Sequence, residues 1–363
     1  DYAVYVSYAA SANRSTDARF HIYHTGGASE VVLNQQVHGG TWVYLGAYHF
    51  AAGLLPDTGS VTLGNDSTSA GFYVSADAVR LGGGMGEIQR GTAVSGRPKF
   101  EECSRYWAQY QGAPASVYDS VATTPDNDDD VSCRPRLAEF EKAAGEDAVF
   151  VSWHTNAYLG SSRGTESYIY DGGATTGSAE LRHAIHSELI NDFRAAYDPA
   201  WIDRGELSAN FGELRLLSTM PGTLTEIAFH DNATDANYLK DPKFRMVAAR
   251  ALCQGIVKYF NPSAVLLPEP PQRPEAHATS SGCVRLTWAA PPTDSLGLVG
   301  HAATSYKVYA SADGHGFDGG QATANLFLDA CGLAAGQARY FRVTALNAGG
   351  ESFPTEVLAV RVP

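Results

Sequence analysis

The chain has 363 residues and a formal net charge of -13, with 44% hydrophobic and 18% charged residues. This length predicts two or three domains that each bury a core of their own, and the composition excludes a largely disordered chain. The acidic balance argues against a protein that binds nucleic acid by electrostatic attraction. Because the sequence contains no run of about 18 apolar residues, we expect no membrane span.

The five cysteines bear on the compartment in which the protein works. Cys283 and Cys331 fall in one C-terminal segment, and Cys103 and Cys133 lie fairly close together earlier in the chain. Two disulfides, with Cys253 left over, would suit an exported protein that is extracellular or periplasmic. None of the cysteines has the CxxC spacing, so we do not expect a zinc site built from thiolates.

Residues 1–82 have the pattern of an all-β domain. The alternating or β-branched runs are residues 2–8, 19–24, 30–34, 41–46, 60–63 and 73–80. Glycine and asparagine clusters separate them at short spacing, as in a β-sandwich. The turn at 11–15, the segment 34–42 and the closing segment 76–80 resemble the golvesin-type domain of bacterial exported proteins. The resemblance implies an accessory module, for which glycan binding is one candidate role.

Residues 83–262 alternate helix and strand patterns, which predicts a three-layer α/β domain. Its most informative stretch is 149–157, Val-Phe-Val-Ser-Trp-His-Thr-Asn-Ala. The apolar run predicts an interior strand of a parallel sheet. Ligands bind beyond the carboxyl ends of such strands, so His154 is a candidate metal ligand or catalytic base. A histidine satisfied within the core or a loop is the commoner case and stays open.

The remaining elements of this block follow from periodicity and turn residues. Helices are expected over 99–110, 137–144, 178–197 and 244–260, and strands from 117 and over 164–170, 214–217 and 220–229. We expect a solvated acidic loop at 126–130 and a turn at 201–205. His183 and His186 are spaced to bind a metal from one helix, but we favour a helix-surface role. Glu226 lies inside an apolar run, where a carboxylate is costly unless paired, metal-linked or catalytic.

Several segments of this block have an order and spacing that match a known family. They are 151–157, 164–168, 203–205, 220–221, 225–229 with Asn232, and the terminal helix. Together they resemble the catalytic domain of zinc-dependent N-acetylmuramoyl-L-alanine amidases. Such enzymes hold one zinc with two histidines and a glutamate and use a second glutamate in catalysis. The resemblance implies that His154 is a zinc ligand and that Glu226 is the catalytic glutamate.

The glutamate ligand should open the first long helix, where Glu101 and Glu102 compete. Adjacent helical residues point about a hundred degrees apart, so only one can face the metal; we favour Glu102. The family's other histidine is missing, because residues 83–101 contain no histidine. One account inserts the golvesin-like block into the amidase domain, with the histidine loop upstream of Asp1. The other is a degenerate domain without zinc.

The resemblance implies hydrolysis of the amide between N-acetylmuramic acid and L-alanine in peptidoglycan. Zinc-activated water would attack the carbonyl, and Glu226 would move the proton. We expect Asn156 and Glu166 to shape the cleft or orient ligands, with a purely structural role equally open. The alternatives are a non-catalytic wall- or glycan-binding protein on a degenerate scaffold and another zinc hydrolase such as a peptidase. The oligomeric state is left open.

A proline-rich linker over 263–274 leads to the third block. Residues 275–363 alternate as strands. Trp288, Tyr340 and the segment 345–352 resemble a fibronectin type III sandwich. We expect this block to space or attach the enzyme.

Overall fold

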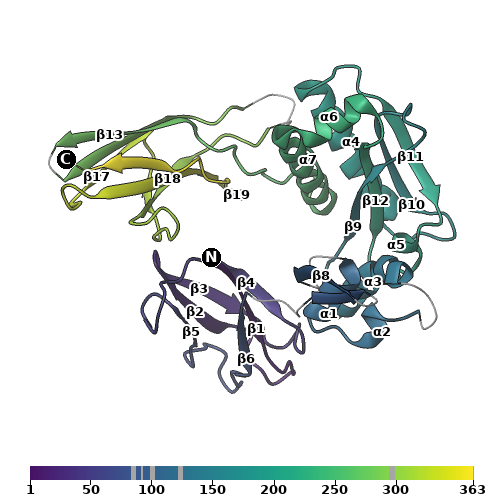
Figure 1. The fold of residues 1–363 in the computed structure, drawn as a ribbon, viewed down its shortest axis with the longest axis horizontal. Coiled ribbons are helices and arrows are strands. Elements are labelled where there is room, and N and C mark those ends of the chain that lie inside the picture. The colour runs from purple at the N-terminus through teal and green to yellow at the C-terminus, as the bar shows by residue number, and fades with distance from the viewer. Residues whose placement is uncertain are drawn as a thin grey trace. The chain divides into compact units, whose positions relative to one another are not determined.

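The computed structural model of the chain describes residues 1–82, 87–90, 93–98, 103–121, 126–280, 282–293 and 299–362. Two compact units are present, one formed by residues 84–264 and the other by residues 1–83 with 265–363. Figure 1 draws the fold and labels most of the helices and strands. Among the described residues, no helix is both long and apolar enough to cross a membrane.

The N-terminal part consists of two three-stranded antiparallel sheets, ordered β4-β1-β6 and β3-β2-β5. The strands are β1 (Tyr2–Ser7), β2 (Ala18–His24), β3 (Gly27–Leu33), β4 (Val43–Tyr48), β5 (Ser60–Leu63) and β6 (Ala78–Leu81). Every second residue of β2 is buried, as alternation across a strand requires. Val4 and Val6 of β1 join Phe20 and Ile22 of β2 in one core, so the two sheets pack together as a sandwich.

The C-terminal part also consists of two sheets, ordered β13-β14-β17 and β16-β15-β18-β19, with β20 paired to β18. The strands are β13 (Gln272–Ser280), β14 (Cys283–Ala289), β15 (Ser305–Ser311), β16 (Gln321–Thr323), β17 (Phe327–Cys331), β18 (Ala338–Asn347), β19 (Gly350–Glu351) and β20 (Leu358–Arg361). A disulfide joins Cys283 to Cys331 across β14 and β17. Cys103, Cys133 and Cys253 are free, so the second expected disulfide is not formed.

The α/β unit contains a four-stranded sheet, ordered β11-β10-β12-β9. The strands are β9 (Phe150–Asn156), β10 (Thr165–Tyr170), β11 (Asp203–Ala209) and β12 (Gly222–Phe229), and β7 (Glu87–Arg90) pairs with β8 (Ala93–Pro98) in a separate hairpin. β12 runs parallel to β9 but antiparallel to β10. The expectation of an interior strand in a parallel sheet was therefore wrong for His154. Its strand, β9, is at the edge of the described sheet, whereas every residue of β12 is buried.

The helices of this unit are α1 (Ser104–Tyr110), α2 (Ala115–Tyr118), α3 (Asp126–Glu141), α4 (Ser178–Ala196), α5 (Gly212–Arg215), α6 (Ala233–Lys240) and α7 (Pro242–Phe260). The acidic run expected to be a solvated loop is instead the first turn of α3. Asp129 and Asp130 accept hydrogen bonds from the backbone amides of Val121 and Arg105, and acidic side chains are favourable at a helix N-terminus. These contacts explain why the run is helical.

Three shorter predictions in this unit were also wrong. The strand expected from Val117 is part of α2, and the strand expected over 214–217 overlaps α5. Residues 203–205 of the turn expected at 201–205 belong to β11 instead. Apolar runs of about four residues suit a helical turn and a strand equally well, so tertiary packing decides their structure.

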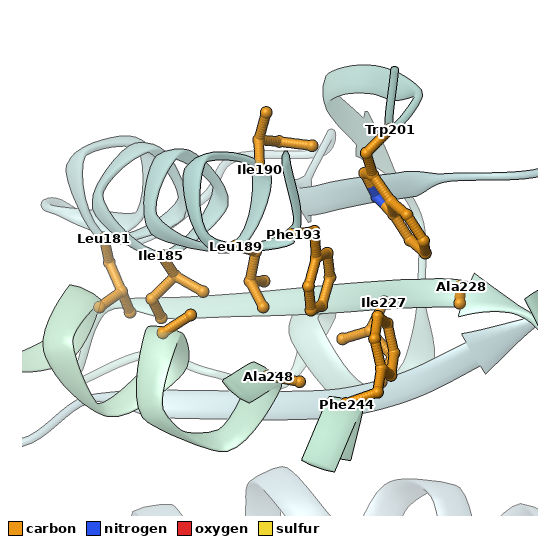
Figure 2. Packing of buried hydrophobic residues seen from close by; sticks show 11 residues of the cluster. Leu181, Ile185, Leu189, Ile190, Phe193, Trp201, Ile227, Ala228, Phe244 and Ala248 are labelled. Carbon is orange, nitrogen blue, oxygen red and sulfur yellow. The ribbon is translucent and has the colours of Figure 1, made fainter. Parts of the chain in front are cut away.

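Helices α4 and α7 form the main core of this unit with β12 (Figure 2). The fully buried members include Leu181, Ile185, Leu189, Phe193, Phe244, Ala248 and Ala251. Ile227 of β12 enters the same core. Because successive strand residues point to opposite faces, the neighbouring Glu226 faces the other side of the sheet.

Candidate functional site

The candidate site lies on the sheet face turned away from α4 and α7. Glu226 of β12 is the register partner of His154 on β9 and also of Glu166 on β10. Directly paired residues point to the same face of a sheet. Two residues that the sequence predicted for the site, His154 and Glu226, are thus brought together, with Glu166 beside them.

Among the described residues, the buried Glu226 carboxylate has no oppositely charged partner. Its side chain is almost fully covered, with 9% relative exposure, and its Oε2 has no hydrogen-bond partner among the described residues. Burial, together with the nearby carboxylates of Glu166 and Glu213, raises the pKa of Glu226 to about 7. A carboxyl group with such a pKa can take up and release a proton near neutrality, as a general base and acid must.

Glu166 is held in a fixed position beside Glu226. Its Oε1 accepts a hydrogen bond from Asn156 Nδ2 at 2.5 Å, and its Oε2 accepts one from Arg204 Nε at 2.8 Å. Because β12 lies between β9 and β10, the bond from Asn156 spans the strand that carries Glu226. Both Glu166 oxygens are engaged, so Glu166 and Asn156 are suited to forming a wall of the site rather than to reacting.

His154 makes its contacts through one ring nitrogen. Nε2 lies 2.8 Å from Ser152 Oγ and 3.7 Å from Glu213 Oε1. Within the described part of the chain, Nδ1 has no hydrogen-bond partner. Burial lowers the pKa of His154, against the opposing effect of the Glu213 carboxylate. The lowered pKa favours the neutral imidazole, which is the form that binds metals.

Glu213 is a site residue that the sequence analysis missed. It lies on α5 with only 7% relative exposure, and its Oε1 accepts a hydrogen bond from Arg134 Nη1 at 3.0 Å. Arg134, on α3, also bonds Asp130 and the Ser104 hydroxyl at the start of α1. A signal was present in the sequence, because Glu213 is a lone carboxylate in an apolar segment, as Glu226 is.

The other candidates of the sequence analysis have different outcomes. Glu102 and its alternative Glu101 lie outside the described residues. His183 Nδ1 lies 2.7 Å from Glu206 Oε1, and the buried His186 lies between Ser167 Oγ at 3.0 Å and Asp203 Oδ1 at 2.9 Å. Although Ser167, His186 and Asp203 are ordered like a nucleophilic triad, Ser167 is fully buried, and no substrate can reach it.

The donor groups on this face suit a zinc ion. Zinc takes imidazole nitrogen and carboxylate oxygen ligands, and the face offers Nδ1 of His154 as a ligand. The unpartnered Oε2 of Glu226 lies on the same face, where it can accept a proton. His154, Glu213 and Glu226 do not bring three ligand atoms within 4.8 Å of one another in the described chain. The described residues therefore fit part of a zinc site, and a complete site needs ligands beyond them.

Two family models match the chain. Residues 1–83 match the golvesin C-terminal domain, and residues 116–258 match the N-acetylmuramoyl-L-alanine amidase family. The second range contains His154, Glu213 and Glu226 and begins after Glu102.

Individual relatives match a limited part of the chain. A sporulation-specific N-acetylmuramoyl-L-alanine amidase of Bacillus subtilis (strain 168) is 44% identical over 113 residues, which are 31% of this chain and 40% of the relative. The N-acetylmuramoyl-L-alanine amidase CwlM of Bacillus licheniformis is 41% identical over 115 residues, again 31% and 40%. This chain therefore spans 40% of the length of each of these relatives.

Among solved structures, the chain is similar to the catalytic domain of CwlV, an N-acetylmuramoyl-L-alanine amidase from Bacillus (Paenibacillus) polymyxa var. colistinus. The sequence identity is 28%, the match covers 36% of this chain and 65% of that chain, and the TM-score is 0.31.

Proposed function

We propose that the α/β unit is a zinc-dependent N-acetylmuramoyl-L-alanine amidase of an exported, extracellular or periplasmic protein. It cleaves the amide bond between N-acetylmuramic acid and the L-alanine of the peptidoglycan stem peptide. The proposal rests mainly on Glu226, a buried carboxylate with a pKa of about 7 that is register partner to His154. Both residues lie within the range that matches the amidase family.

The flanking domains have accessory roles in this proposal. Residues 1–82 form a golvesin-like module, and residues 275–363, after the linker 263–274, form a fibronectin type III-like module. Both are sandwiches of antiparallel strands. The described residues of the candidate site, His154, Glu213 and Glu226, all lie within the block 83–262.

Zinc, when bound, would polarise the scissile carbonyl and lower the pKa of the attacking water. His154 and Glu102 are the residues of this chain that we propose as ligands. Glu226 takes the proton from the attacking water and passes it to the departing amine nitrogen. Its pKa of about 7 suits both transfers, because the group gains and loses the proton with little free-energy difference. Asn156 and Arg204 keep Glu166 in place beside it.

The test is the release of stem peptides from purified murein by the zinc-loaded full chain. Wild-type protein should release peptides with L-alanine at the N-terminus. The E226Q variant should lose at least about 100-fold in rate while keeping its zinc. The matched control is E206Q, because Glu206 pairs with His183 and Arg182 on α4, away from the site.

Three outcomes would contradict the proposal, each in a different way. Hydrolysis by E226Q at the wild-type rate would remove Glu226 from the mechanism. Binding of murein without peptide release would favour a non-catalytic wall-binding protein. Cleavage only between amino acids of the stem peptide would favour a peptidase.

A further inference from the structure

We infer that Glu213 is a positioning residue that fixes the tautomer of His154, with the proton on Nε2 and the lone pair on Nδ1. This deepens the proposed function, since that lone pair is what a zinc ion would use. Neither the sequence pattern nor the family resemblance assigned a role to Glu213.

The groups around Nε2 decide which ring nitrogen of His154 carries the proton. A neutral imidazole carries its proton on one nitrogen and a lone pair on the other. The Ser152 hydroxyl, 2.8 Å from Nε2, can donate or accept and so does not decide between the tautomers. The Glu213 carboxylate, 3.7 Å away, can only accept. It attracts an N–H at Nε2 and repels a lone pair there.

At 3.7 Å the contact between Glu213 and His154 is electrostatic rather than a hydrogen bond. Its strength depends on how well water screens it. Glu213 is 7% exposed, and His154 is partly buried. Water screens this pair only in part, so the Glu213 charge favours a proton on Nε2, against the opposing charge of Arg134. Ser152 Oγ then accepts the hydrogen bond from Nε2–H.

Arg134 holds the Glu213 carboxylate in place. Its guanidinium, which stays protonated in proteins, donates to Glu213 Oε1 at 3.0 Å and to Asp130 Oδ2 at 2.5 Å. Leu214, the next residue of α5, is buried and anchors the helical turn. The carboxylate is thus oriented from α3 and α5, elements separate from the strand that carries His154.

The arrangement leaves Nδ1 for the metal. Metal-binding histidines almost always engage their second ring nitrogen with a carboxylate, carbonyl or water, which fixes the ring and the tautomer. Around His154, the carboxylate lies next to Nε2, and the nitrogen without a partner in the described chain is Nδ1. This is the arrangement expected of a histidine that binds a metal through Nδ1 and is held by a carboxylate at Nε2.

The direct test is the tautomer of His154 in the metal-free full chain. Long-range ¹H–¹⁵N spectra of protein with ¹⁵N-labelled histidine distinguish Nε2–H from Nδ1–H, and H154Q identifies the signal. We expect Nε2–H in the wild type and a mixture in E213Q, because a neutral amide can present either its oxygen or its NH₂ group. A wild-type Nδ1–H tautomer would overturn the inference, and this reading needs no Glu213 variant to fold.

The second measurement is zinc affinity by competition with a chromogenic chelator. E213Q should bind zinc about 10- to 100-fold more weakly, as for other residues that support a ligand. E206Q removes a glutamate beside a different histidine, His183, and should stay within about twofold of wild type. Unchanged affinity in a folded E213Q protein would contradict the role.

The two proposals fail in distinguishable ways. If murein is not hydrolysed but His154 is the Nε2–H tautomer and E213Q weakens zinc binding, the amidase function fails and the role of Glu213 stands. If murein is hydrolysed but His154 carries its proton on Nδ1, the reverse holds.

Discussion

The raised pKa of the buried Glu226 carboxyl group makes the stability of the folded chain depend on pH. In the folded chain its pKa is about 7, compared with an ordinary value of 4.5. Between these two pH values the folded state holds a proton that the unfolded state has released. Stability therefore decreases as the pH rises from 4.5 to 7 and stays reduced above that range.

We expect the E226Q variant, studied without metal, to be more stable than wild type above pH 7. The shift of the Glu226 pKa from 4.5 to about 7 corresponds to at most about 3 kcal/mol. Urea unfolding at about pH 5 and pH 8, followed by a signal from the α/β unit, should show the advantage of E226Q widening at the higher pH. A stability difference independent of pH would mean that Glu226 is ionised in the folded state.

The predictability of the site differed from residue to residue. Glu226 stood out because it is the one charge in the run 220–229, and His154 because it closes an apolar run. Glu213 has a similar signal, but it directly precedes the predicted strand 214–217, and the sequence pattern assigned it no partner. Its partner Arg134 is 79 residues away in the sequence, and only the folded chain joins them. Glu102 remains a prediction.

Among the secondary-structure elements, the long helices could be predicted from the sequence and the short ones could not. The helix expected over 178–197 is α4, Ser178–Ala196, and that expected over 244–260 is α7, Pro242–Phe260. Both present an apolar side over about five turns, which strongly favours a helix. The four-residue α5 has no such period, and its conformation depends on packing against α3, β12 and β10.

The close packing of α4 on α7 depends on Gly255. A Cβ atom at this position would lie 2.6 Å from Ile185 Cα and 3.0 Å from Ala184 O. Both are backbone atoms of the facing helix, so the contact cannot be relieved by a side-chain rotation. The glycine is thus required by the neighbouring helix rather than by its own backbone conformation.

We expect G255A to destabilise the α/β unit by about 1–3 kcal/mol, the usual cost of overpacking, although alanine is the better helix former. Thermal unfolding should show the lower midpoint. M246A, in the exposed half of the same helix, should change stability by less than about 0.5 kcal/mol. A stabilised G255A would show that α4 and α7 can move apart freely.

At the scale of the whole molecule, the candidate site and the disulfide belong to different compact units. The described site residues lie within 84–264, whereas Cys283 and Cys331 lie in the other unit. The disulfide closes a segment with a sequence separation of 48. Constraining the unfolded chain over that length contributes about 4 kcal/mol in the chain-entropy picture.

We therefore expect the double variant C283S/C331S to lose about 2–4 kcal/mol of stability in the C-terminal sandwich. Hydrogen exchange of peptides from β13 to β20 should accelerate, while zinc affinity and murein hydrolysis stay at wild-type values. C253S, which removes a free thiol, is the control. Loss of zinc affinity in the double variant would show that the two units are coupled.

The complete burial of β12 has a consequence for the chain before it folds. Its sequence, Gly-Thr-Leu-Thr-Glu-Ile-Ala-Phe, is rich in strand-forming residues and contains a single charge. Such segments self-associate when exposed, and a charge within them opposes aggregation. In the unfolded chain Glu226 is ionised at neutral pH and acts as a gatekeeper. The proposed catalysis and solubility during folding therefore both require a carboxylate at position 226.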